Sequence, residues 1–350
     1  MATLVPAPDE LTWLAADRQA ELRDRYRLYY PAGDVVYGIL HKERLFAAAQ
    51  EYGVGVPPTW FPEDREEATS LARESGGSFV LKPKTHVGIR GWTKGAVAPS
   101  WQQLPAVYDR VVRSLRYDPT VARSDPGIHV PFLQRYFAGA RAGIYNLAGF
   151  IDQTGKLTAL GATRKVLQYP RDLGVGVCFE AAPVRADVAA ALLRLLTGVG
   201  FYGIFEAEFI DRDDELLLID LNPRLFQSVG FNMARGLRLP LIWFLAAHGD
   251  WGRVEEELAR ARRVEDGSGQ PSRWVHRIAL ETMVAARLAT FRMSPAEGKQ
   301  WFGWLTDKRS LTVNATWSTN DPWPGRVNAV QHLAMFVKNP KYFYGTFVRD

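Results

Sequence analysis

The most chemically informative part of the sequence is a pair of strand-like segments that carry acidic residues and are joined by a polar turn at 211–214. Side chains alternate along a strand, so Glu206 and Glu208 share one face of the first segment, and Asp220 and Asn222 share one face of the second. Carboxylate and amide oxygens are the hard ligands that Mg²⁺ selects. The pattern therefore predicts a divalent-cation site on a β-hairpin.

The register of this hairpin decides which side chains meet. With residue 211 opposite residue 215, the two glutamates, the aspartate and the asparagine all lie on one side of the sheet. Like charges this close are costly unless a cation neutralises them. Arg224, two residues beyond the asparagine, offers the alternative of a structural salt-bridge cluster. The second acidic strand favours the metal site over that alternative.

A second feature suits phosphate binding. A short apolar strand over 78–82 ends on Lys82 and runs into a loop with glycines and basic residues. A fixed cation beside backbone N–H donors suits a polyphosphate. The loop is not a Walker A loop, because the G-K-[ST] ending is missing. We interpret it as a lid over phosphates in which basic side chains replace some backbone amides. The binding residues assigned to it are Gly88, Gly91 and Lys94.

Taken in order along the chain, these segments resemble the ATP-grasp superfamily, which includes biotin carboxylase and carbamoyl phosphate synthetase. The Asp-Leu-Asn-Pro-Arg run is similar to the family's Glu-x-Asn-x-Arg pattern, whose oxygens bind two Mg²⁺ ions that bridge the phosphates of ATP. The resemblance assigns Glu208, Asp220 and Asn222 as metal ligands, with Mn²⁺ as a substitute ion. It assigns Arg224 to the transferred phosphoryl group. Spacing leaves open which glutamate of the first strand binds metal, and the resemblance selects Glu208.

The resemblance also assigns nucleotide-binding residues. Segment 41–45 is similar to the family's helix whose lysine reaches phosphate, which selects Lys42. Segment 79–83 resembles the strand whose terminal lysine, Lys82, contacts the α-phosphate and the adenine side. Segment 132–137 looks like the hinge between lobes, where backbone groups read the adenine edge. The residues assigned to this hinge are Gln134, Arg135 and Phe137.

Residues 163–176 form a basic strand followed by a glycine-rich turn, which on its own is a charged hairpin end. The ATP-grasp resemblance implies that Arg164 and Lys165 approach the γ-phosphate and the carboxylate being activated. The R-K-x-x-Q-Y-P and N-P-R segments look like those of a subgroup of carboxylate–amine ligases related to D-aspartate-type ligases of cell-wall synthesis.

The expected fold class is α+β, because antiparallel hairpins alternate with helices. The resemblance implies an ATP-grasp fold, in which two α+β lobes with antiparallel sheets clasp the nucleotide. Residues 1–33 are expected to be the remnant of a preceding α/β domain that is largely missing. The resemblance implies that residues 34–250 are the ATP-grasp domain, with a small lobe at about 58–133 and a large lobe at about 134–250. Residues 251–350 are expected to be a basic, tryptophan-rich and mostly helical region.

Composition limits the class of protein. The chain has 350 residues, 47% of them hydrophobic, and a single cysteine, which excludes a disulfide framework. Neither a membrane-spanning run nor a secretion signal is recognised, so we expect a soluble cytoplasmic protein. Residues 251–350 hold 15 basic and 10 acidic residues and six of the 11 tryptophans. Such a region could touch an anionic membrane surface, but burial of its tryptophans in a helical cap is favoured.

The predicted function is an ATP-dependent carboxylate–amine ligase that forms an amide through an acyl phosphate, with small-molecule acid and amine substrates. One alternative is a carboxylate–thiol ligase. Another is a catalytically impaired ATP-binding subunit, whose partner subunit supplies the missing domain; a homodimer is also open. The balanced charge of residues 1–250 argues against nucleic acid as a partner.

Overall fold

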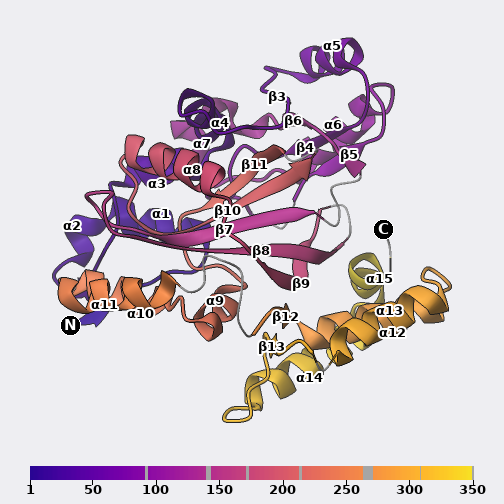
Figure 1. Ribbon diagram of the computed structural model, residues 1–350. Helices are drawn as coiled ribbons and strands as arrows, with labels where there is room; N and C mark the ends of the chain where they lie inside the picture. Colours follow the sequence, from indigo (N-terminus) through magenta and orange to yellow (C-terminus); the bar gives the residue numbers. More distant parts are fainter. Residues whose placement is uncertain are drawn as a thin grey trace.

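The computed structural model describes residues 1–90, 94–138, 143–170, 173–212, 215–262, 271–307 and 309–348. Within these ranges the chain forms one large and one small β-sheet, both flanked by helices (Figure 1), and a parallel pair of two-residue strands, β1 (Ala2–Thr3) and β2 (Tyr26–Arg27). This arrangement confirms the predicted α+β class. In the described ranges, no helix is long and apolar enough to span a membrane.

Seven strands form the large sheet: β7 (Ile144–Ile151), β8 (Thr158–Tyr169), β9 (Val175–Ala182), β10 (Gly203–Arg212), β11 (Glu215–Asn222), β12 (Arg273–Val275) and β13 (Thr312–Asn314). Their order in space is β11-β10-β7-β8-β9-β12-β13. All neighbours are antiparallel except β12 and β13, which run parallel. Hairpins build most of this sheet, since β7 to β9 follow one another and β10 turns directly into β11.

The large sheet is buried on both faces. The alternation of β7 sends Leu147 into one core, where helices α4 (Lys42–Glu51) and α8 (Ala186–Gly198) pack. The next residue, Ala148, points into the opposite core, which includes residues of α10 (Leu239–Ala247) and α11 (Trp251–Ala261).

Four antiparallel strands form the small sheet, in the order β3-β6-β4-β5: β3 (Thr59–Trp60), β6 (Phe132–Arg135), β4 (Phe79–Lys82) and β5 (Ala96–Ala98). Helices α5 (Arg65–Ser75) and α6 (Leu104–Ser114) share its core. The side chain of Asp64 caps α5 by accepting from the backbone N–H of Glu67. Gln134 pairs opposite Val80 in this sheet, so it lies in the small lobe rather than in the large lobe that the sequence predicts.

The N-terminal helices are shorter than predicted. The sequence favours one helix over about 8–30 and a second from 34 to 52, whereas the structure breaks both. The elements are β1 (Ala2–Thr3), α1 (Asp9–Asp17), α2 (Gln19–Leu22), β2 (Tyr26–Arg27), α3 (Gly33–Leu40) and α4. His41 separates the last two helices because its backbone is extended, with φ −96° and ψ 111°. The N–H of Lys42 then donates to the carbonyl of Lys84 at 2.7 Å, which joins the start of α4 to the segment after β4.

The remaining elements lie mainly in the C-terminal part: α7 (Pro119–Ser124), a 3₁₀ turn (Pro126–His129), α9 (Val229–Arg235), α12 (Arg277–Ala289), α13 (Pro295–Thr306), α14 (Trp323–Lys338) and α15 (Pro340–Phe347). Strand β12 pairs with β9, so residues beyond 250 extend the large sheet as well as forming helices. Trp274 is buried, as expected. The expectation is wrong for Trp317 and Trp323, whose exposed fractions are 48% and 65%.

Candidate functional site

The β10–β11 hairpin presents its polar side chains on one face. Glu206 lies directly opposite Asn222, and Glu208 lies directly opposite Asp220. Side chains of directly opposite residues project to the same side of an antiparallel pair. The four residues therefore share one face, as the sequence predicts.

A β-bulge produces this shared face. At the turn end, Asp211 pairs with Leu216, so the predicted pairing of 211 with 215 is wrong by one residue. If that register continued, Glu208 would lie opposite Ile219, and Asp220 would point to the other face. The register instead shifts at Glu208, and the extra residue on β11 returns Asp220 to the polar face.

Each of the two opposed carboxylates has a lysine partner from another element. Lys42, the first residue of α4, forms an ion pair with Asp220. Lys165 on β8 places its Nζ 2.9 Å from Oε2 of Glu208. Both lysines are buried, so each charge depends on its partner for compensation. The site is a compact array of alternating charge at the surface of the large sheet.

Arg224 is held by three partners. Its Nε donates to the carboxylate of Asp9, its Nη1 donates to the carbonyl of Leu225 at 2.9 Å, and its Nη2 donates to Oδ1 of Asn222 at 3.1 Å. Asn222 in turn faces the buried Glu206, with Nδ2 and Oε2 separated by 3.5 Å. The guanidinium plane is thus fixed at the edge of the acidic face.

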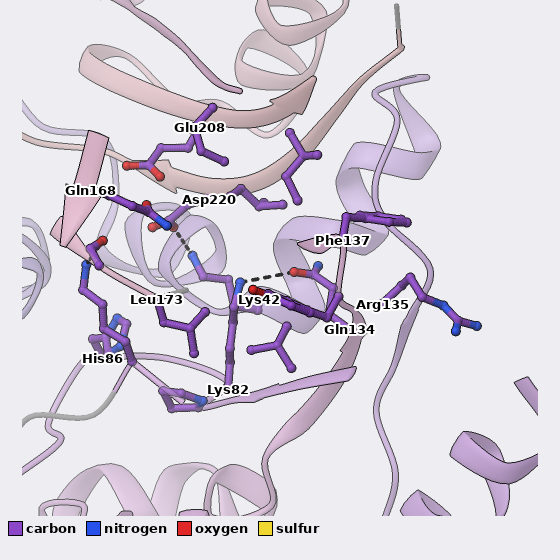
Figure 2. Close-up of a pocket in the computed structure, with 18 residues that line it drawn as sticks. Lys42, Lys82, His86, Gln134, Arg135, Phe137, Gln168, Leu173, Glu208 and Asp220 are labelled. Carbon is purple, nitrogen blue, oxygen red and sulfur yellow. Dashed lines mark hydrogen bonds and ion pairs between the residues drawn. The ribbon is translucent and has the colours of Figure 1, made fainter. Parts of the chain in front are cut away.

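A cavity of about 160 Å³ lies between the two sheets, and Figure 2 shows the side chains that surround it. Lys82 at the end of β4 donates to Oε1 of Gln134 at 3.2 Å, and Gln134 donates from Nε2 to Oγ1 of Thr59 at 3.0 Å. Both sheets contribute apolar walls. These apolar residues are Val80, Phe137, Ile144, Leu173, Ile210 and Ile219. The cavity combines an apolar slot with a charged end that holds Lys42, Lys82, Glu208 and Asp220.

A second cavity, of about 460 Å³, adjoins the first. The two share His86, Lys94, Gly174, Glu208 and Asp220 in their linings. The second cavity is otherwise lined by the N-terminal segment, the loop after β4, the β8–β9 region, strands β10 and β11, and the segment after β11. Its charged and polar lining residues include Asp9, Glu10, Lys165, Glu206, Asn222, Arg224, Gln227 and Ser228.

The protein environment shifts the pKa values of several of these side chains. Burial lowers the pKa of Lys82 to about 8 and also lowers the pKa of Lys94. Burial, together with the neighbouring Glu208, raises the pKa of Glu206 to about 8. Burial alone would raise the pKa of Asp220, but the ion pair with Lys42 holds it well below its ordinary value. Acidic and basic groups with shifted pKa values around one cavity are typical of a functional site.

Arg164 is not brought to the cavities. It neighbours Lys165 on β8, so their side chains point to opposite faces of the sheet. On the far face, Arg164 pairs with Asp211 at 2.9 Å. The prediction that Arg164 and Lys165 both approach the phosphates is therefore wrong for Arg164, because two consecutive strand residues cannot face the same cavity.

Some of the residues assigned to the hinge and the lid line the cavities, and others do not. Arg135 lines the first cavity, but its side chain points away from it in Figure 2 and donates to the carbonyl of Ser75 at 3.0 Å. Gly88 lines neither cavity; a Cβ there would lie 2.6 Å from Val121, so this glycine serves packing. Lys94 lines both cavities and donates to the carbonyl of Gly174 at 2.9 Å. Gly91 lies outside the described residues.

Sequence reasoning missed several lining residues. Asp9 is not among the predicted site residues, yet it contacts Arg224. Gln168 and Gly174 belong to a segment that the sequence marks as a basic strand and glycine-rich turn, and His86 belongs to the loop after Lys82. The glycine-rich turn and the loop after Lys82 are recognisable in the sequence, so these segments could be identified. Which of their side chains line a cavity is decided by the fold.

The donor set is compatible with a hard divalent ion. In the described part of the chain, no three His, Cys, Asp or Glu side chains gather into a complete metal site. The predicted set of Glu208, Asp220 and Asn222 supplies two carboxylates and one amide oxygen on a single face. Oxygen donors of this kind fit Mg²⁺, whose coordination is usually completed by water and substrate phosphates.

The fold is that of the ATP-grasp proteins. The biotin carboxylase domain of 2-oxoglutarate carboxylase from Hydrogenobacter thermophilus is similar with a TM-score of 0.58 and 18% identity, over 71% of this chain and 53% of that one. Biotin carboxylase from Campylobacter jejuni has a TM-score of 0.53 and 16% identity, over 75% and 54%.

N5-carboxyaminoimidazole ribonucleotide synthetase from Thermus thermophilus has a TM-score of 0.52 and 16% identity, over 71% of this chain and 62% of that one. The chain thus spans between about half and three fifths of the length of these structures. At these identities the likeness is one of fold. No protein-family model and no curated protein matches the sequence.

Proposed function

We propose that the protein is an ATP-dependent carboxylate–amine ligase that acts in the cytoplasm on small molecules. The observation that carries the proposal is the pair of carboxylates Glu208 and Asp220, each matched to a buried lysine, where the two cavities meet. Such an array can exchange its internal ion pairs for contacts with a metal-bound triphosphate. Two of the similar structures contain adenine nucleotides, which supports a nucleotide in this fold.

The first cavity suits ATP. Apolar side chains from both sheets, such as Val80 and Ile219, would hold the adenine ring, beside the backbone of the segment that carries Phe137. Lys82 and Lys42 stand at the charged end and would contact the phosphates. Lys94 lines both cavities and would cover the phosphates from the loop side.

Magnesium would be held by Glu208, Asp220 and Asn222, with two ions expected and Mn²⁺ as a substitute. Bound there, the ions would neutralise phosphate charge as Lewis acids. Binding of ATP would draw Lys42 and Lys165 from their carboxylate partners towards phosphate oxygens. The carboxylates would then become available as ligands, so charge stays balanced throughout.

The second cavity would hold the acid and the amine. A carboxylate oxygen of the acid would attack the γ-phosphorus of ATP, with ADP as the leaving group. The amine nitrogen would then attack the acyl carbon, which breaks the acyl–oxygen bond and releases phosphate and a proton. Lys165 and Arg224 border this cavity and would stabilise negative charge on the transferred group.

Positional isotope exchange tests the proposal without knowledge of the amine. ATP labelled with ¹⁸O in the β,γ-bridge is incubated with the protein, Mg²⁺ and a panel of carboxylic acids. Reversible acyl-phosphate formation frees the β-phosphate to rotate, so an accepted acid moves label from the bridge to non-bridge positions. Binding of Mg-ATP with no exchange or hydrolysis for any acid would favour the nucleotide-binding subunit instead. Absence of Mg-ATP binding in calorimetry would refute both functions.

A further inference from the structure

Helix α14 carries a row of large apolar side chains on its outer face. Trp323, Val327, Val330, Leu333 and Val337 recur at three- and four-residue spacing, which aligns them along one side of the helix. Their exposed fractions range from 51% to 68%. We name these five residues the α14 apolar stripe.

The opposite face of α14 already anchors the helix. Met335 packs in the core formed with α12 and α15. The ring of His332 lies 5.9 Å from that of His276 and 5.3 Å from that of Phe347, measured between centroids. The stripe is therefore not needed to hold α14 in place. A helix that is apolar on both faces is normally covered on both, so the stripe indicates a binding surface.

The charge around the stripe indicates what covers it. From Asp321 to Val348 the sequence has three basic residues, Arg326, Lys338 and Lys341, and one acidic residue, Asp321, at the start of the helix. All three basic residues are exposed. The guanidinium of Arg326 lies 5.2 Å from the centroid of the Trp323 ring, so cation and indole form one amphipathic unit.

A second copy of the chain is a poor match for this surface. A two-fold interface brings the same patch of each copy together, so the basic residues beside the stripe would meet like charges. An anionic partner has the complementary charge. Tryptophan, branched apolar residues and flanking Lys and Arg on one helix are the combination found in helices that lie in a membrane interface.

We propose that the α14 apolar stripe docks the protein on an anionic lipid surface, with the helix in the plane of the interface. Neither cavity described above has a lining residue in α14. Figure 1 shows α14 with the other C-terminal helices, on the far side of the large sheet from the small lobe. Docking would therefore leave the cavities open to small molecules. The proposal does not depend on the reaction proposed above.

Co-sedimentation with vesicles tests this proposal on the intact protein. The vesicles are phosphatidylcholine alone, or phosphatidylcholine with about 40% phosphatidylglycerol. We expect at least about tenfold stronger partition onto the anionic vesicles, weakened by high salt. Leu333→Asp should reduce that partition at least about tenfold, and Lys338→Glu should reduce it chiefly at low salt.

Leu11→Asp is the matched control, because Leu11 is also an exposed leucine on a helix, α1, with an exposed fraction of 51%. It should bind like the wild type, and unchanged circular dichroism would show that all variants are folded. Equal partition onto both kinds of vesicle, or wild-type partition by Leu333→Asp, would overturn the proposal. So would a wild-type dimer in light scattering that Leu333→Asp dissociates, or specific binding to an acidic protein without vesicle binding.

Discussion

Asp9 accepts a hydrogen bond from Nε of Arg224, although the two residues lie 215 positions apart in the sequence. Asp9 opens helix α1, and Arg224 follows strand β11. Both side chains are largely buried and line the second cavity. The first turn of α1 thus fixes the arginine that the proposed reaction places beside the transferred phosphoryl group.

Replacing Asp9 should affect chemistry more than nucleotide binding. Asp9→Ala releases Nε of Arg224, so we expect acid-dependent isotope exchange to fall at least about tenfold, while the Kd for Mg-ATP changes less than about threefold. The loss of a charge-assisted hydrogen bond should also cost about 1–3 kcal/mol of unfolding free energy. Exchange and calorimetry measure the two effects separately.

Glu10→Ala is the control for Asp9→Ala, since Glu10 is the next residue and lines the same cavity. It should leave exchange close to that of the wild type. Asp9→Asn keeps an oxygen that can accept from Nε and should recover part of the lost exchange. Equal losses in Glu10→Ala and Asp9→Ala would contradict a specific positioning role for Asp9.

Substitutions of the two neighbouring basic residues of β8, Arg164 and Lys165, should have very different effects on isotope exchange. Lys165→Met removes the partner of Glu208 at the cavity, and we expect isotope exchange to fall at least about a hundredfold. Arg164→Met removes only an ion pair with Asp211 on the other face of the sheet, so exchange should remain within about threefold of wild type. Similar losses in both variants would show that the cavity face is assigned wrongly.

The sequence predicts this hairpin face but not how it arises. Alternation along the strands was enough to group Glu206 and Glu208, and to group Asp220 with Asn222. The relation between the two groups depends on a register that the turn and a bulge set together. Pairing of residue 211 with residue 215 and no bulge gives the same shared face as the observed pairing of 211 with 216 and a bulge at Glu208. The face was therefore predicted correctly from a register that is wrong.

Alternation could also have corrected the prediction for β8. The sequence assigned both Arg164 and Lys165 to the phosphates because the resemblance carries the pair as a unit, although consecutive strand residues face opposite sides. Asp9, by contrast, could not have been assigned to the site from the sequence. No local pattern connects it to Arg224, because the packing of α1 against α3, which in turn contacts β11, brings the N-terminal segment to the cavity.

Removing the charge of Glu208 should weaken metal-dependent binding. In Glu208→Gln we expect Mg²⁺ to strengthen ATP binding at least about tenfold less than in the wild type, because one carboxylate ligand is lost. The buried Lys165 also loses its partner, which should lower stability by about 1–3 kcal/mol. Calorimetry with and without Mg²⁺, and denaturant unfolding, measure the two quantities.

Asp211→Asn is the matched control for Glu208→Gln. Asp211 is on the same strand, three residues away, but pairs with Arg164 outside the cavities. Its substitution should leave the effect of Mg²⁺ on ATP affinity unchanged. If Glu208→Gln and Asp211→Asn respond to Mg²⁺ alike, the proposed ligand set is wrong.

The lowered pKa of Lys82 predicts how binding depends on pH. Burial lowers this pKa from 10.5 to about 8, so the ammonium group loses its proton as the pH rises through 8. ATP phosphates should favour the charged form, and we therefore expect ATP affinity to fall above pH 8 and binding near pH 8 to take up a proton. Calorimetry in buffers of different ionisation enthalpy measures this uptake. Lys82→Met should abolish it.

The same group gives a signed prediction for stability. Between pH 8 and 10.5 the unfolded chain keeps the Lys82 proton while the folded protein loses it, so the unfolded state binds more protons. The unfolding free energy of the wild type should therefore rise with pH relative to that of Lys82→Met, by up to about 1.4 kcal/mol per pH unit. Below pH 8 the difference between the two proteins should be constant. Curves that stay parallel from pH 7 to 10.5 would mean that Lys82 keeps an ordinary pKa in the cavity.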